Sequence, residues 1–567
     1  MNRTTVSEHG DARTRDGGGD DDGTRGDGLR RAASGIALVV AAGAAALLAV
    51  GAFLGLYVRP TSDDWCALWK TRDMGVLGIT ADFYSTQNGR VTNAFLTGLL
   101  YSDDMRGPKL LPAVLVVALG SGLFFLARAA LRALRLPRPP VVLLVAAAAL
   151  LSALLFFAGT RSYQVLLWAP AAISHTLPSV IGLWAVLAAV RAARGGPRWA
   201  RGAAVGSALV TGVALGMLSE PFTLVGGLLA ATVGVLCLPR LGWAADRYVS
   251  TWCAAACLGL ATGLTLLYTS PGARWRRAQH PQESLSLAGL GETFHDWWRV
   301  WQTIGGQGAY AGALAVGALL GLALAAARPR TDETARTGRT DRTDSKDSKD
   351  RAARTDRTDR TDRTDHSERT ARTDHSERTA RTARAVGRDR PGGLPPRWLF
   401  LVVVLLPLPL VLLASLAVVH GLRSGYGDTG WTYGRTWTNF LFPLLLALCA
   451  YGAWGGYLLG RRLLAPVPRP AGRAAALVAA GAVALGSAAA LVQPVRELTT
   501  ATVVRSVAWD RQNARIRSEV AAGAREVAYG PLLIGGLSEP LFASSYERDW
   551  AARCTATYYR VDRIHRP

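Results

Sequence analysis

The sequence predicts an all-α polytopic membrane protein with about eleven transmembrane helices. Of the 567 residues, 50% are hydrophobic, and most of these fall in long runs rich in Leu, Ala, Val and Gly. Uncharged runs of about 20 residues are what an α-helix needs to cross the hydrocarbon core of a bilayer. Arginine is concentrated in short loops on alternate sides of these runs, as the positive-inside rule requires.

The formal net charge of +23 would indicate nucleic-acid binding in a soluble protein. In a chain of membrane spans, basic loops instead mark the side that stays in the cytoplasm. We therefore expect membrane lipids as partners and no nucleic acid.

The chain begins with residues 1–31, which are rich in Gly, Asp and Arg and predict a disordered cytoplasmic tail. The first span is expected at 33–58, within a transmembrane module over 32–328. Its apolar run is longer than that of a signal peptide and lacks a cleavage site, so it predicts an uncleaved anchor. Arg30 and Arg31 place its start in the cytoplasm, and the next segment, 59–109, is then the first outer loop.

Ten further spans follow if basic loops are kept inside. Residues 329–397, with RTD triplets and a tandem RTDHSERTA repeat, predict a disordered cytoplasmic insert between two groups of spans. Transmembrane helices resume over 398–492. Residues 493–567 are soluble in character and predict a small extracytoplasmic domain with a helix at 505–527. The expected spans are 110–126, 141–158, 177–190, 202–218, 222–238, 249–267, 304–327, 398–419, 440–459 and 474–491.

The acidic pair Asp63 and Asp64 directly follows the first span and is the main candidate for chemistry. One carboxylate there can accept a proton from an acceptor hydroxyl, or the pair can help to bind a divalent cation such as Mg or Mn. The alternative is a solvated acidic start of a loop.

Other polar residues also fall on the predicted outer side, some against the positive-inside trend. Basic residues on the outer side favour a shared anionic ligand. The alternative is that each of them contacts lipid headgroups separately. For His175, the alternative is an ordinary polar loop residue. Cys66 and Cys554 both fall outside, in an oxidising space, and are candidates for a disulfide. The candidate binding residues are Asn88, Arg90, His175, Glu220, Arg274, Arg276, Arg277 and Arg435.

Motifs of soluble enzymes are missing from the sequence. It contains no phosphate-binding G-x-x-x-x-G-K-[ST] loop, no paired C-x-x-C zinc pattern and no G-x-S-x-G elbow. The other four cysteines lie in or next to spans, where Cys behaves as a small apolar residue.

Four short motifs carry a resemblance to a known group. DDWC…NGR after the first span, SEP at an outer corner, SPGARWRR after a span and YYRV near the end resemble a poorly characterised family of bacterial polytopic membrane proteins. That family is related to the GT-C glycosyltransferases, which include protein mannosyltransferases, aminoarabinose transferases and mycobacterial arabinofuranosyltransferases. The resemblance covers the membrane part and the end of the chain, not the N-terminal tail or the RTD insert.

The resemblance implies transfer of a hexosyl or pentosyl group from a polyprenyl-phosphate donor to an envelope glycan or lipid acceptor outside the plasma membrane. Asp63 or Asp64 would then be the general base or a metal-associated acid. A residue of the basic run (Arg274, Arg276 or Arg277) would hold the lipid phosphate, and Arg90, Glu220 and Arg435 would contact sugar or phosphate. Acidic residues are sparse in the later outer loops, which argues against a fully protein-ligated metal.

Two other functions stay open at this point. A transporter or flippase of lipid-linked glycans would predict ionisable residues within spans and an internal repeat of span pairs. The sequence has few charged residues in the middle of its spans and shows no obvious repeat of span pairs. A non-catalytic anchor or sensor, whose C-terminal domain binds a partner, leaves the acidic pair unexplained.

Overall fold

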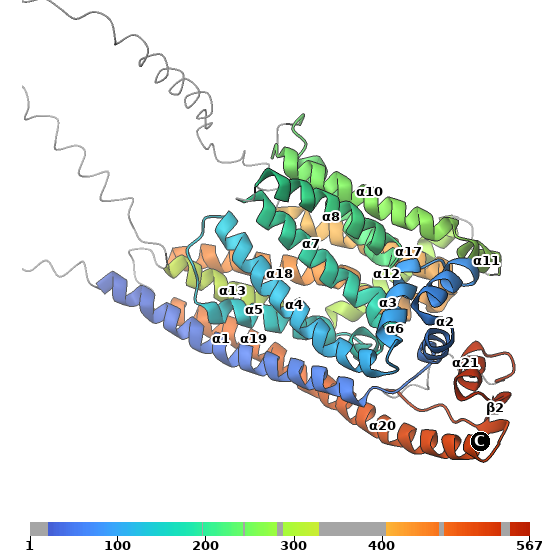
Figure 1. The fold of residues 1–567 in the computed structure, drawn as a ribbon. Helices are drawn as coiled ribbons and strands as arrows, with labels where there is room; N and C mark the ends of the chain where they lie inside the picture. The colour runs from blue at the N-terminus through green and yellow to red at the C-terminus, as the bar shows by residue number, and fades with distance from the viewer. Residues whose placement is uncertain are drawn as a thin grey trace, which may run out of the picture. The chain divides into compact units, whose positions relative to one another are not determined.

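The computed structural model describes residues 21–194, 197–241, 244–279, 287–327, 404–463, 470–534 and 545–567 (Figure 1). The predicted all-α membrane class is confirmed at the level of helix content and composition. In these ranges, eight helices are long and apolar enough to cross a membrane. The RTD insert lies outside the described residues.

Eight of the expected spans correspond to helices that are long and apolar enough to cross a membrane. The eight candidates involve α1, α4, α7, α10, α13, α17, α18 and α19, and the expected spans at 141–158, 202–218 and 222–238 correspond to the helices α5, α8 and α9. Their bounds are α1 Asp21–Leu54, α4 Arg106–Ala133, α5 Val141–Phe157, α7 Leu177–Ala193, α8 Arg198–Gly216, α9 Glu220–Leu236, α10 Arg247–Thr269, α13 Ala311–Ala326, α17 Pro407–Tyr426, α18 Thr438–Leu463 and α19 Pro470–Ala490.

Small residues allow the closest helix pairs. A Cβ added at Gly321 of α13 would lie 2.0 Å from the carbonyl oxygen of Ala453, and one at Gly452 of α18 would lie 1.9 Å from that of Leu314. Glycines of α8 and α10 meet in the same way. Close backbone approach of this kind is how helices associate where lipid leaves no hydrophobic force between them. The central helix α5 is buried over almost its whole length, against α1, α4, α13 and α18.

Two stretches differ from the prediction. Helix α1 begins at Asp21, so the part of the tail at 21–31 is helical and not disordered, while residues 1–20 lie outside the described part. The expected outer loop 59–109 is largely helical: it contains α2 Asp63–Thr86 and α3 Val91–Tyr101, and α4 begins before its end. Apolar residues of α2 are buried where it contacts α3 and α21, and α3 in turn contacts α4. This packing stabilises local helices that a solvated loop would not form.

Short helices join the long ones at their ends. The segment 159–176, expected as an outer loop, is mostly buried and folds into three short helical pieces. These three pieces are η2 Tyr163–Leu167, α6 Ala169–Ala171 and η3 Ala172–Thr176. The other connecting helices are η1 Gly55–Tyr57, α11 Pro271–Gln279, α12 Leu287–Gly305, η4 Gly308–Tyr310, η5 Gly427–Thr432 and η6 Gly434–Trp437.

The C-terminal segment continues directly from the last span. Helix α20, Val492–Ala521, extends from α19 and contacts α1 near its end (Figure 1). It is followed by β1 Glu526–Ala528, α21 Trp550–Tyr559 and β2 Arg563–His565, and the two strands pair in parallel with Val527 opposite Ile564. The predicted helix at 505–527 corresponds to the second part of α20, but the helix ends at Ala521 and the end of the predicted range lies in β1. This segment belongs to the same compact unit as the membrane helices.

Candidate functional site

Six of the predicted site residues come together from distant parts of the chain. Asp63 begins α2 and lies within electrostatic range of Arg90, Arg276 and Arg435. His175 lies within range of Arg90 and Arg435, and Arg90 forms an ion pair with Glu220 at 2.5 Å. These residues stand on α2, the N-cap of α3, η3, the start of α9, α11 and η6.

The NGR and SPG motifs form one structural unit. Gly89 has φ +75°, and a Cβ there would lie 2.1 Å from Ser270 Oγ, so no larger residue fits against the end of α10. Asn88 shapes the turn, because its Oδ1 accepts a hydrogen bond from the backbone N–H of Arg90 at 3.1 Å. A Cβ at Gly272 would lie 2.7 Å from the backbone nitrogen of Gln87. This contact seats the turn that carries Arg90 against the start of α11, which carries Arg276.

The two adjacent aspartates have different environments. Asp64 is only 1% exposed, and both of its carboxylate oxygens are occupied. One accepts the backbone N–H of Thr61 at 2.9 Å, and the other accepts the hydroxyl of Tyr101. Burial raises the pKa of Asp64 to about 7, although these two hydrogen bonds act to lower it. Asp64 therefore ties the start of α2 to the end of α3.

Asp63, by contrast, is half-buried and makes no hydrogen bond or ion pair with any residue that the structure describes. Burial raises the pKa of its carboxyl group, and the charges of Arg435, Arg276 and Arg90 oppose that rise. The preceding residue, Ser62, has φ 46° and ψ −111°, a backbone conformation that residues other than glycine rarely adopt. An accessible carboxylate with a perturbed pKa beside fixed cations is typical of a functional group.

The arginines are not equivalent. The guanidinium of Arg435 lies over the rings of Trp168 at 5.2 Å and Tyr433 at 5.1 Å, which fixes its position. The charge of Arg90 is compensated by Glu220.

Of the three arginines in the basic run, Arg276 is the one whose charge acts on Asp63. Arg274 donates to the carbonyl oxygen of Thr269 at 2.9 Å, and Arg277 donates to that of Tyr268 at 2.8 Å. Both are thus bound to the end of α10. Arg276 acts on Asp63 and makes no hydrogen bond or ion pair within the described ranges.

His175 interacts electrostatically with Arg435 and Arg90 and is only 7% exposed. Its carbonyl oxygen accepts a hydrogen bond from Thr438 Oγ1 at 3.2 Å, and the neighbouring Ser174 accepts one from Asn93 Nδ2 at 2.8 Å. Its ring Nδ1 has no hydrogen-bond partner in the described part of the chain. His175 sits in a π-helical turn, an irregularity that is frequent at functional sites.

The residues present do not fit a protein-bound Mg or Mn ion. No group of three or more His, Cys, Asp or Glu side chains that could hold a metal occurs among the described residues. The oxygens of Asp64 are already occupied, and Asp63 is surrounded by positive charge.

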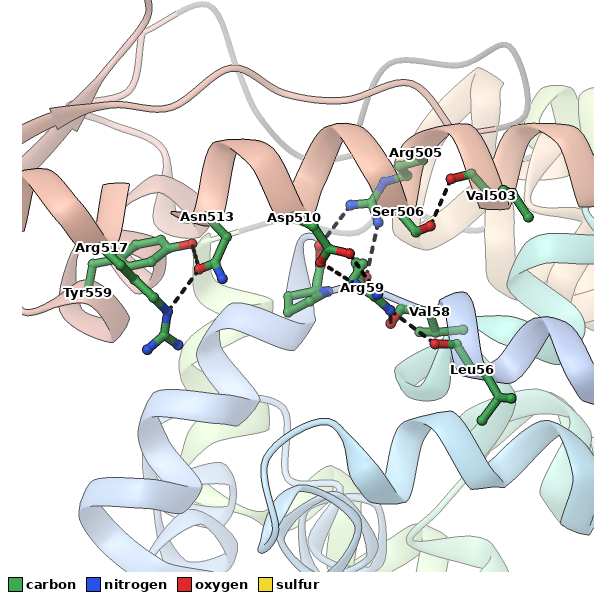
Figure 2. Close-up of polar contacts among 11 residues, drawn as sticks. Leu56, Val58, Arg59, Val503, Arg505, Ser506, Asp510, Asn513, Arg517 and Tyr559 are labelled. Carbon is green, nitrogen blue, oxygen red and sulfur yellow. Dashed lines mark hydrogen bonds and ion pairs between the residues drawn. The ribbon is translucent and has the colours of Figure 1, made fainter. Parts of the chain in front are cut away.

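The C-terminal segment is attached to the start of α2. A disulfide joins Cys66 of α2 to Cys554 of α21, with Cα atoms 4.9 Å apart. On α20, Arg505 donates to the backbone carbonyls of Arg59 and Pro60. Figure 2 shows this side chain reaching from α20 to the segment before α2, next to the ion pair of Arg59 and Asp510. Sequence reasoning missed Arg505 and Tyr101, because a lone Arg or Tyr far away in the chain gives no signal.

A cavity of about 380 Å³ is formed by other residues, among them Ala158, Gln307, Ser487 and Leu491. Its lining includes no charged side chain and no residue of the site above. It therefore adds nothing to the chemistry at Asp63.

Comparisons of the chain with protein-family models, with curated proteins and with solved structures find no match.

Proposed function

We propose that the protein is a membrane glycosyltransferase of the GT-C type, which transfers a sugar from a polyprenyl-phosphate donor to a cell-envelope glycan or lipid. The observation that carries this proposal is the carboxylate of Asp63. It has no partner among the described residues, yet Arg90, Arg276 and Arg435 approach it from three separate segments. The site thus combines a proton acceptor with cations suited to a phosphate.

The reaction assigns a role to each group. The acceptor hydroxyl oxygen forms a bond to the anomeric carbon of the donor sugar, and its proton passes to the carboxylate of Asp63. The bond from that carbon to the phosphate oxygen breaks, and polyprenyl phosphate leaves with the electron pair. Arg276 and Arg435 stabilise the negative charge that develops on the leaving phosphate. Burial raises the pKa of Asp63, which makes its carboxylate a stronger base than an exposed one.

The proposal includes a topology of eleven spans in the plasma membrane, with the N-terminus in the cytoplasm and the C-terminus outside. The eight long apolar helices support it, together with α5, α8 and α9. At 1.5 Å per residue, α5 and α9 are about 25 Å long, close to the thickness of the hydrocarbon core. The disulfide also supports an outer location for the site and the C-terminal segment, because such bonds persist outside the cytoplasm.

The test uses the full chain in lipid nanodiscs. Wild-type protein should bind a polyprenyl phosphate, measured by native mass spectrometry, and should transfer label from one of a panel of polyprenyl-phosphate-linked hexoses and pentoses. Arg276→Met and Arg435→Met should each weaken polyprenyl-phosphate binding by about 10- to 100-fold, as expected for a lost hydrogen bond to a charged group.

Arg274→Met is the matched control, because Arg274 lies on the same helix but is bound to the carbonyl of Thr269. It should change the affinity by less than about twofold, as for an ordinary surface substitution. Absence of polyprenyl-phosphate binding by the wild type, or equal losses for Arg274→Met and Arg276→Met, would contradict the proposed function.

A further inference from the structure

The segment directly before α2 is held by hydrogen bonds from a distant helix. Arg505 of α20 is only 5% exposed, and its two terminal nitrogens donate to the carbonyl oxygens of Arg59 at 3.1 Å and Pro60 at 2.7 Å. Next to it, the side chain of Arg59 forms a two-pronged ion pair with Asp510 at 2.7 and 2.9 Å (Figure 2). A planar guanidinium that holds two consecutive carbonyls fixes the direction of the chain between them.

A second attachment follows within a few residues. Trp65 is fully buried, and its ring lies 6.1 Å from that of Trp509 on α20 and 5.2 and 5.6 Å from those of Tyr558 and Tyr559 on α21. Cys66 is then bonded covalently to Cys554 of α21. Within α20 and α21, Asn513 accepts hydrogen bonds from Arg517 and Tyr559, which ties the two helices together (Figure 2).

Asp63 lies between these two attachments. Ser62, directly before it, has φ 46°, and a residue other than glycine stays in such a conformation only where its surroundings enforce it. The carbonyls of residues 59 and 60 are held on one side, and the side chains of residues 65 and 66 on the other. Besides the bonds of Asp64 to Thr61 and Tyr101, the backbone on both sides of Asp63 is thus held by residues more than 400 positions later in the sequence, since Arg505 bonds across a separation of 446.

We infer that the C-terminal segment from α20 to β2 is the positioning element of the site, with Arg505 as its key positioning residue and the Cys66–Cys554 bond as a covalent lock. The inference rests on the proposed function only in giving Asp63 the role of the base. Loosening the segment should turn the carboxylate away from Arg276 and Arg435 without removing any group that contacts the substrate. It should therefore lower kcat for sugar transfer more than it raises KM for the donor.

The test compares Arg505→Met, Arg505→Lys and the control Arg511→Met in nanodiscs. Arg511 lies on the same helix, is exposed, and makes no hydrogen bond or ion pair to the residues that the structure describes. The first readout is hydrogen exchange at the backbone amides of Asp64 and Trp65, which bond to the carbonyls of Thr61 and Ser62. Arg505→Met should speed their exchange by about tenfold or more while exchange in α13 stays unchanged, and Arg505→Lys should restore part of the protection.

The second readout is transfer from the polyprenyl-phosphate sugar that the wild type uses. A fall in kcat for Arg505→Met, partly recovered in Arg505→Lys and absent in Arg511→Met, supports the inference. Double substitution of Cys66 and Cys554 by Ser should act in the same direction. Unchanged exchange at Asp64 and Trp65, equal acceleration in α13, or full kcat despite faster exchange would each overturn it. If the wild type transfers no sugar, the proposed function fails, and the exchange data still decide whether the C-terminal segment holds the start of α2.

Discussion

Replacing each of the two adjacent aspartates by asparagine should give opposite results. Asp63→Asn removes a carboxylate that makes no hydrogen bond or ion pair with the described residues, so the fold should lose little, but the proposed base is removed. Asp64→Asn changes a buried group whose two oxygens are occupied. Asparagine can replace it there, because its oxygen can accept the N–H of Thr61 while its NH2 group donates to the hydroxyl oxygen of Tyr101.

The expected magnitudes follow from these contacts. Loss of a general base lowers the rate by about 100- to 10,000-fold, so Asp63→Asn should retain at most about 1% of wild-type kcat. Asp64→Asn exchanges one hydrogen bond for another of similar strength, which costs at most about 1 kcal/mol of stability and leaves kcat within about tenfold of wild type.

The assay is transfer of labelled sugar in nanodiscs, measured beside the thermal unfolding midpoint of each variant. Equal loss of activity in both variants, with both folded, would mean that the distinction between a free and a structural carboxylate is wrong. Full activity of a folded Asp63→Asn protein would refute the role of Asp63 as the base.

Three further predictions concern stability. Burial raises the pKa of Asp64 from 3.8 to about 7, so the folded state favours the protonated form of this group. The free energy of unfolding should therefore fall by on the order of 4 kcal/mol as pH rises from about 4 to about 7. In a series of denaturation experiments over this pH range, Asp64→Asn should abolish that part of the fall. Gly89→Ala should lower the free energy of unfolding by about 1–3 kcal/mol, since Gly89 has φ +75° and an added Cβ would lie 2.1 Å from Ser270 Oγ; an unchanged unfolding midpoint would contradict this. Double substitution of Cys66 and Cys554 by Ser should cost about 2–5 kcal/mol, and two free outer thiols found by mass spectrometry of unreduced, alkylated wild-type protein would remove the basis for it.

Much of the membrane architecture follows from the sequence alone. The length of apolar runs and the placement of arginines predict where helices cross a bilayer, because insertion depends on properties of each segment and not on its neighbours. The same reasoning predicts one common side of the membrane, the outer side, for six polar residues. In the structure these residues interact electrostatically: Asp63, Arg90, His175, Glu220, Arg276 and Arg435. The helices α2 and α3 were missed because their stability comes from packing and not from a regular hydrophobic pattern.

The sequence by itself could not distinguish between neighbours of the same type. Asp63 and Asp64 have nearly identical local contexts, and only the burial of Asp64 against Tyr101 separates a structural carboxylate from a free one. In the same way, Arg274 and Arg277 bond to the end of α10, whereas Arg276 is left to act on Asp63. Successive residues of a helix point in different directions, so the partner of each depends on which distant segment packs against its side of the helix. For Asp63, that segment includes α20, and nothing in the local sequence around Asp63 or Arg505 indicates that the two would meet.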